Sequence, residues 1–316
     1  MSVFVRHRAE DLVFAALFGL SARVPRSAML ALGSAIGTLG YHADRHRRRV
    51  ALDNLRLAYG SALSEREARR VALGCFRHFA RITLDTVACS RFSSDEMRAL
   101  VAYEGLEHIR AAYALKRGVL LFSGHYGHWE LTALMQGWLG LPLTLITRPL
   151  DNPRLEHRLA RVRSRSGNRV VHRRNAVKEM LRAVREKSGV AILIDQNARR
   201  AGILVPFFGH PAATVPTLAL LALRTGAVVV PTFSLPEGRR YRIVYEPPVS
   251  IVATGDLVAD VARLTEQFTA IIERRIRERP EVWLWLHRRW KRDPAPPAVP
   301  TSGGGASPGG RTTERA

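Results

Sequence analysis

Short runs rich in Val, Ile and Leu alternate with segments of helical pattern from about residue 100 onward, and this alternation constrains the fold most strongly. It is typical of βαβ units, in which helices connect parallel strands and cover both faces of the sheet. We therefore predict an α/β fold with a mostly parallel central sheet flanked by helices. The predicted strands are 118–124, 143–148, 168–172, 190–195, 227–233 and 241–246, and the predicted helices are 128–138, 153–165, 175–187, 215–225 and 256–278.

Residues 1–100 have a helical pattern throughout and include two apolar stretches, 11–20 and 28–41. Each stretch is shorter than the ~20 apolar residues that span a bilayer, and an arginine cluster follows at 42–50. This order suits helices that lie in a membrane interface with guanidinium groups among anionic headgroups. A pair of ordinary core helices with a solvated basic face, or a bent spanning hairpin, are the alternatives.

The domain organisation follows from these patterns. We predict an N-terminal helical membrane-associating region at 1–100 and an α/β domain at 101–292 that forms one fold with it and carries the candidate site residues. The Pro-, Gly- and Ser-rich segment 293–316 is predicted to be a disordered tail.

The charge balance is strongly basic, with 49 Lys and Arg against 27 Asp and Glu, a net charge of +22. All but four of the basic residues are arginine, and codon bias in an Ala/Arg/Leu-rich chain is the alternative explanation for the scattered ones. The clustered arginines imply a polyanionic partner: nucleic acid, an anionic membrane surface or a phosphorylated substrate. Nucleic acid is disfavoured, because the chain has no zinc finger, RRM-like aromatic block or basic tail. Cys75 and Cys89 lack a CxxC spacing, which favours a reducing compartment and structural roles for both.

The stretch SGHYGHWE, residues 123–130, combines a strand end with two histidines and a carboxylate. Five residues along a helix is about 500° of rotation, so His125 and Glu130 can meet only if His125 precedes the helix that contains Glu130. Ligands bind at the carboxyl ends of strands in open α/β sheets, and a new helix presents free N–H groups there. A histidine paired with a carboxylate in this position is a candidate general base for a substrate hydroxyl.

Other interpretations of this stretch compete. The H-x-x-x-x-E spacing alone is common by chance, and a buried structural His125 is the default for a lone histidine. Ser123 is not in a G-x-S-x-G elbow, which disfavours a serine hydrolase. His128 forms an H-x-x-H pair with His125, but no third metal ligand stands at a persuasive spacing, so we predict no metal.

Three blocks in the same order carry a family resemblance: SGHYGHWE, the stretch 195–233 that begins DQNARRAG, and PEVWLWLHRRWKR at 280–292. Together they resemble the bacterial lipid A late acyltransferases, the lauroyl and myristoyl transferases of the lysophospholipid acyltransferase superfamily. They are also similar to the acyltransferases of phosphatidylinositol mannosides. The resemblance covers nearly everything but the tail.

The resemblance implies an acyl transfer from a thioester, either acyl carrier protein or coenzyme A, to a hydroxyl of a phosphorylated glycolipid. A lipid A precursor is the expected acceptor, and a phosphatidylinositol mannoside or another glycolipid or lysophospholipid is the alternative. It implies His125 as general base and Glu130 as its partner, no cofactor beyond the co-substrate, and a place at the cytoplasmic face of the inner membrane. A hydrolase or a membrane-anchoring protein that kept the fold is a further alternative. The residues expected to contact substrate are Arg148, Gly167, Asp195 and Gln196.

Two apolar segments suit either of two roles, contact with lipid or packing in the core. The block 205–212, VPFFGHPA, is expected to be a loop near the site that shapes an acyl-chain channel, although Phe207 and Phe208 are equally suited to a core. The tryptophans Trp283, Trp285 and Trp290 suit either a membrane interface or core packing.

Overall fold

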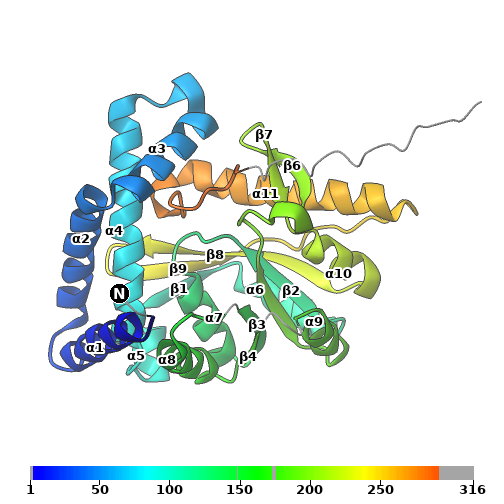
Figure 1. Cartoon of the computed structure of the whole chain (residues 1–316). Coiled ribbons are helices and arrows are strands. Elements are labelled where there is room, and N and C mark those ends of the chain that lie inside the picture. The colour runs from blue at the N-terminus through cyan, green and yellow to red at the C-terminus, as the bar shows by residue number, and fades with distance from the viewer. Residues whose placement is uncertain (1–2, 148, 173–175, 292–316) are drawn as a thin grey trace, which may run out of the picture.

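The computed structural model describes residues 3–147, 149–172 and 176–291 (Figure 1). Its central sheet has seven strands in the order β1-β9-β8-β2-β5-β3-β4. Neighbouring strands run parallel except β8 and β9, which are antiparallel. The predicted mostly parallel α/β fold is therefore confirmed. The strands are β1 (Val101–Glu104), β2 (Val119–Ser123), β3 (Leu143–Thr147), β4 (Arg169–His172), β5 (Gly189–Leu193), β8 (Val228–Glu237) and β9 (Arg240–Tyr245).

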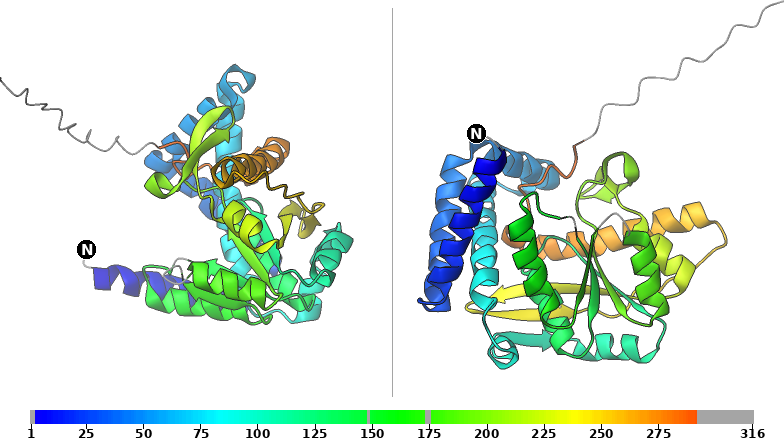
Figure 2. Two further views of the ribbon diagram at one scale, coloured as in Figure 1. Left: turned by 90° about the vertical axis from the view of Figure 1, so that its right-hand side faces the viewer. Right: turned by 60° about the horizontal axis from the view of Figure 1, so that its bottom comes forward.

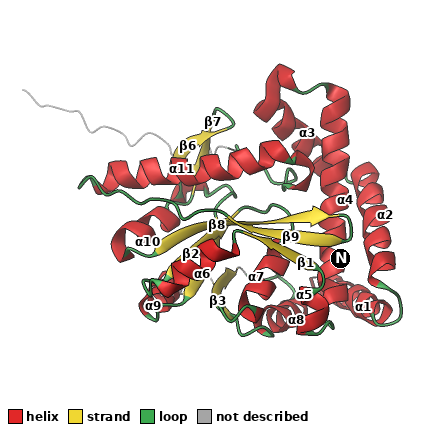
Figure 3. Ribbon diagram, turned by 180° about the vertical axis from the view of Figure 1, so that it is seen from behind, coloured by secondary structure: helices red, strands yellow, loops and turns green. Residues whose placement is uncertain are grey.

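Helices cover both faces of this sheet, as Figures 1 and 3 show. The side chains of β2 are all buried because they alternate between two apolar clusters. The covering helices are α6 (Leu106–Ala114), α7 (Trp129–Trp138), α8 (Pro153–Ser164), α9 (Ala176–Arg185), α10 (Thr217–Thr225) and α11 (Leu257–Glu278). Leu120 and Phe122 pack with α9, α10 and α11, whereas Val119 and Leu121 pack with α6 and α7.

Two strand regions were missed by the sequence analysis. The edge strand β1 has only four residues, too few for a clear pattern. The block expected as a loop at 205–212 forms most of an antiparallel hairpin, β6 (Ile203–Phe207) and β7 (His210–Thr214). Its prolines Pro206 and Pro211 conceal the strand pattern, and Phe208 and Gly209 turn the chain with φ of 52° and 74°.

The first hundred residues form helices that stand against one end of the sheet (Figures 1 and 2). They are α1 (Val3–Ser21), α2 (Arg26–Ala43), α3 (Arg45–Tyr59), α4 (Glu65–Cys89) and α5 (Ser94–Arg98). Ser64 and Glu67 form the predicted capping box at the start of α4. Among the described helices, none has both the length and the sustained apolarity needed to cross a bilayer.

Apolar side chains remain exposed on the outer helices α1 and α2. Leu12 is 72% exposed on α1, and Leu39 is 69% exposed on α2, with Val13 and Ile36 beside them in sequence. The inner face of α2, by contrast, buries Met29, Leu30, Gly33, Gly37 and Tyr41 against its neighbours. Helices α1 and α2 therefore contribute side chains both to the core and to an exposed apolar surface.

The C-terminal segment returns across the molecule after α11 and includes the short helix η4 (Pro280–Val282). Trp283 is 1% exposed and Trp285 is not exposed at all. Their rings pack with Phe207 and Phe208 of the hairpin. These two tryptophans and the two phenylalanines are therefore packed in the core rather than exposed at a surface.

Helices α2 and α4 pack closely against each other, and glycine permits their backbones to approach. A Cβ at Gly37 would lie 2.5 Å from Arg77 Cα and from the Phe76 carbonyl oxygen. A Cβ at Gly40, on the same helix, would meet only the Phe76 ring at 3.5 Å.

We predict that Gly37→Ala lowers the free energy of unfolding by about 1–3 kcal/mol, because the methyl group forces the helices apart. Gly40→Ala is the matched control and is expected to be neutral or stabilising by up to ~1 kcal/mol through helix propensity. Urea denaturation followed by circular dichroism measures both. Equal effects of the two substitutions would contradict this account of the α2–α4 contact.

Candidate active site

The candidate site lies at the carboxyl ends of β2 and β5, which are adjacent and parallel in the sheet. Ser123 and Leu193 stand opposite each other in the last register pair, and Ile194 donates its N–H to the Ser123 carbonyl at 3.1 Å. The two strands therefore end next to each other at the same edge of the sheet. Residues 125 and 195, 70 positions apart, therefore emerge side by side where ligands bind in open α/β sheets.

His125 and Asp195 form a hydrogen-bonded pair. Nδ1 of His125 lies 2.8 Å from Oδ1 of Asp195, and the backbone N–H of His125 donates to Oδ2 at 2.7 Å. A carboxylate accepts only, so Nδ1 carries the proton and Nε2 presents its lone pair. Gly124 permits this approach, because a Cβ there would lie 2.9 Å from Oδ2 of Asp195.

The electrostatic surroundings of the pair raise the basicity of the imidazole. Burial opposes protonation of His125, but the Asp195 charge and hydrogen bond, with a smaller contribution from Glu130, outweigh it and raise the His125 pKa above 6.5. Burial alone would raise the pKa of Asp195, yet His125 and the Trp283 indole hold that pKa below its usual value. The pair is thus a buried carboxylate with a strengthened base beside it.

Gln196 lies on the open side of this pair. Its Nε2 is 3.3 Å from Nε2 of His125, so its amide N–H faces the free lone pair of the imidazole. Gln196 is exposed, whereas Asp195 is only 4% exposed. The Gln196 amide stands where a substrate hydroxyl would need to donate its proton.

Glu130 lies in the first turn of α7 and forms a two-point ion pair with Arg163 of α8. Nε of Arg163 donates to Oε2 at 2.8 Å, and the second nitrogen contacts Oε1. The contacts of the described residues include no hydrogen bond between Glu130 and His125. The carboxylate that orients the imidazole is Asp195, because the loop after β2 lies beside β5. Glu130 acts on His125 only through its charge, and its catalytic role stays a prediction.

Two other predicted substrate contacts are not tested by this geometry. Arg148 lies outside the described residues. Gly167 stands in the exposed turn between α8 and β4 with φ of 91°, which is the tight turn expected for it. A contact of Gly167 with substrate stays a prediction.

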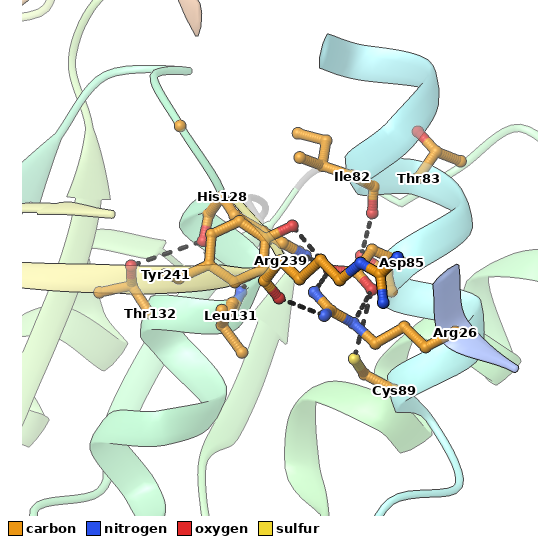
Figure 4. A network of polar contacts seen from close by, with 12 residues as sticks. Arg26, Ile82, Thr83, Asp85, Cys89, His128, Leu131, Thr132, Arg239 and Tyr241 are labelled. Atoms are coloured by element: carbon orange, nitrogen blue, oxygen red, sulfur yellow. Dashed lines mark hydrogen bonds and ion pairs between the residues drawn. The ribbon is translucent and has the colours of Figure 1, made fainter. Parts of the chain in front are cut away.

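His128 belongs to a buried polar network that joins the N-terminal helices to the sheet (Figure 4). Asp85 of α4 accepts from Arg26 at 2.6 and 2.7 Å and from the Tyr241 hydroxyl at 2.6 Å, and His128 Nε2 lies 3.9 Å away. Nδ1 of His128 accepts the Leu131 N–H at the start of α7. These contacts give His128 a structural role. Within the described ranges, no three metal-ligating side chains gather into a candidate metal site.

Trp283 is a site residue that the sequence analysis missed. Its indole N–H donates to Oδ2 of Asp195 at 2.8 Å, and the Leu284 N–H donates to the His125 carbonyl at 3.1 Å. The cluster of tryptophans in 280–292 was recognisable from sequence. Its contact with a residue 88 positions away was not, since no local pattern reports it.

The model of the family described as bacterial lipid A biosynthesis acyltransferase matches residues 4–292. The lipid A biosynthesis lauroyltransferase of Escherichia coli K12 is 28% identical over 279 residues, 87% of this chain and 89% of that protein. The lipid A biosynthesis myristoyltransferase of the same organism is 25% identical over 86% of this chain and 83% of its own. A phosphatidylinositol mannoside acyltransferase of Mycobacterium tuberculosis is 26% identical over 60% of each chain.

The family match spans both the N-terminal helices and the sheet, and it includes His125, Glu130 and Asp195. The relatives are named acyltransferases, and the resemblance inferred from the three sequence blocks is confirmed. This chain belongs to the bacterial lipid A biosynthesis acyltransferase family and is an acyltransferase.

Proposed function

We propose that this acyltransferase moves a fatty acyl group from a thioester to a hydroxyl of a phosphorylated glycolipid, with His125 as general base. The observation that carries the proposal is the His125–Asp195 pair, which fixes the imidazole with its Nε2 lone pair toward the open side. The acceptor proposed first is a lipid A precursor, because the relatives that cover most of this chain are named for lipid A biosynthesis.

In the proposed step, the acceptor hydroxyl displaces the Gln196 amide and donates its hydrogen bond to Nε2 of His125. The imidazole takes the proton as the hydroxyl oxygen attacks the thioester carbonyl. The tetrahedral intermediate then expels the thiolate, which takes the proton back from the imidazolium. Asp195 stabilises the imidazolium between these events and keeps the ring in place. No protein nucleophile, metal or further cofactor is part of this proposal.

The donor and the membrane are the proposed partners. Arg45, Arg47 and Arg49 are exposed on α3, and Arg288 is exposed beside them, 3.4 Å from His46. Asn197, next to Gln196, donates to the Arg288 carbonyl, so this basic surface continues to the site. It suits phosphate of the acceptor lipid or acidic groups of acyl carrier protein or coenzyme A.

The exposed apolar side chains of α1 and α2 support membrane association of the first hundred residues. We propose a peripheral or monotopic protein at the cytoplasmic face of the inner membrane, with residues 1–100 and 101–292 acting as one fold. The second candidate acceptor, a phosphatidylinositol mannoside, is favoured by the Mycobacterium tuberculosis relative.

The proposed reaction predicts that wild type adds one acyl group to a glycolipid and that His125→Gln does not. Purified protein would be offered lipid extracts with acyl carrier protein and coenzyme A thioesters in separate reactions, and products would be identified by mass spectrometry. Loss of the general base is expected to lower the rate by about 10²–10⁴-fold. His157→Gln, an exposed histidine on α8, is the control. Equal transfer by His125→Gln, or no acylated lipid from wild type with any thioester, would contradict the proposal.

The geometry also predicts which carboxylate supports the base. Asp195→Asn removes the charge that raises the His125 pKa, so the acidic limb of kcat/KM should move to lower pH. The limb reports loss of activity as pH falls through the His125 pKa, because only neutral His125 accepts a proton. The maximum rate should fall about 10²-fold or more, as orientation of the ring is lost.

Glu130→Gln is the matched comparison, since it neutralises the carboxylate that lies nearest to His125 in the sequence but binds Arg163 instead. It should lower the rate less than about tenfold and move the limb only slightly to lower pH. The two pH–rate profiles decide the point. A loss with Glu130→Gln that equals or exceeds the loss with Asp195→Asn would assign the partner role to Glu130.

A further inference from the structure

The segment after α11, residues 280–291, contacts both loops that carry the proposed base and its carboxylate; we call it the C-terminal strap. On the His125 side, the Gly127 N–H donates to the Val282 carbonyl at 2.9 Å, and Tyr126 forms an antiparallel bridge with Trp283. This pairing holds the loop that follows β2.

On the Asp195 side, the strap binds the loop that follows β5. Nε2 of His287 accepts the Asn197 N–H at 3.1 Å, and the fully buried Arg289 donates to the Gln196 carbonyl at 3.3 Å. Arg289 also donates to the Ala213 carbonyl at 2.6 Å, which ties the β6–β7 hairpin to the same loop. The strap therefore joins two loops whose relative position sets the His125–Asp195 distance.

Trp283 is the one strap side chain that binds the carboxylate itself. Its indole Nε1 lies 2.8 Å from Oδ2 of Asp195, and Oδ2 also accepts the His125 backbone N–H. These two donors leave Oδ1 directed at Nδ1 of His125. A buried carboxylate with only one donor on Oδ2 would be freer to rotate about its Cβ–Cγ bond, since that torsion is broad.

Building on the proposed function, we propose that Trp283 is a positioning residue for acyl transfer: its indole N–H fixes the Asp195 carboxylate so that Oδ1 stays aligned with His125. The indole does not touch substrate in this account. Its effect reaches the reaction through the orientation and basicity of the imidazole. This also gives a physical reason for a tryptophan, because phenylalanine could fill most of the same apolar space but has no N–H to donate.

The charged and titratable groups around the pair come from several elements. Glu130 faces it from α7, and His287 and Arg289 face it from the strap, with Arg199 acting on His287 from the loop after β5. None of them is altered by substitution of Trp283. A change in His125 titration would therefore report the Asp195 carboxylate.

The chain offers a matched control in Trp285. Trp285 is fully buried in the same aromatic cluster, with its ring 4.6 Å from that of Trp283, and its indole N–H also has a single acceptor. That acceptor is the Pro280 carbonyl at 2.7 Å rather than Asp195. Trp283→Phe and Trp285→Phe thus remove the same atoms and one indole hydrogen bond each, and only the first touches the carboxylate.

The test is a ¹⁵N NMR titration of the histidine side chains in the full-length protein, with the His125 signals assigned by their absence in His125→Gln. Trp283→Phe should lower the His125 pKa by about half a unit or more, because the Nδ1–Oδ1 bond weakens. The neutral ring should also lose its single Nδ1–H tautomer. Trp285→Phe should leave pKa and tautomer as in wild type. An unchanged or raised His125 pKa in Trp283→Phe would overturn the proposal.

Acyl-transfer kinetics give a second, separate measurement. Trp283→Phe should lower kcat about ten- to a hundredfold with KM within about twofold of wild type, and the acidic limb should follow the NMR shift. A loss matched by Trp285→Phe would mean that the indole only stabilises the fold, which contradicts a positioning role. Absence of transfer by wild type would refute the proposed function, whereas the NMR result would still decide whether Trp283 positions Asp195.

Discussion

The hydrogen bond between His125 and Asp195 is the interaction on which the site depends, and the sheet order creates it. Because β2 and β5 are adjacent and in register to their last residues, the two loops that follow leave the sheet at the same level. A buried carboxylate needs several donors to remain ionised. Asp195 has three: the His125 backbone, the His125 ring and the Trp283 indole. Each donor comes from a segment that the rest of the fold must hold in place.

The N-terminal helix α4 also contacts the loop that carries His125. His78 of α4 contacts the Gly127 carbonyl through Nε2 at 3.1 Å, and burial lowers its pKa to about 3, so it is neutral and donates. Asp85, which lies further along the same helix, connects Arg26 of α2 to Tyr241 of β9. Helix α4 therefore supports the loop that follows β2, and α2, which exposes apolar side chains, is joined to the sheet through Asp85.

Local patterns in the sequence were sufficient for the main strands and helices, since burial on both faces makes β2 and β5 continuous apolar runs. They also placed His125, Asp195 and Gln196 at strand ends. They could not give the strand order, and without it the nearest carboxylate in sequence, Glu130, was the natural partner for His125. The Asp195 and Trp283 contacts span 70 and 88 residues, so only the folded chain reveals them. The hairpin at 203–214 was missed because its prolines and positive-φ turn hide a strand pattern.

Transfer of the acceptor proton to His125 is best tested by a structure of the protein with an acceptor glycolipid and a non-hydrolysable thioester analogue. We expect the reacting hydroxyl to replace the Gln196 amide and to lie about 2.6–3.2 Å from Nε2 of His125, with the His125–Asp195 bond intact. A hydroxyl bound to Glu130, or held away from Nε2 by an undisplaced Gln196, would contradict it.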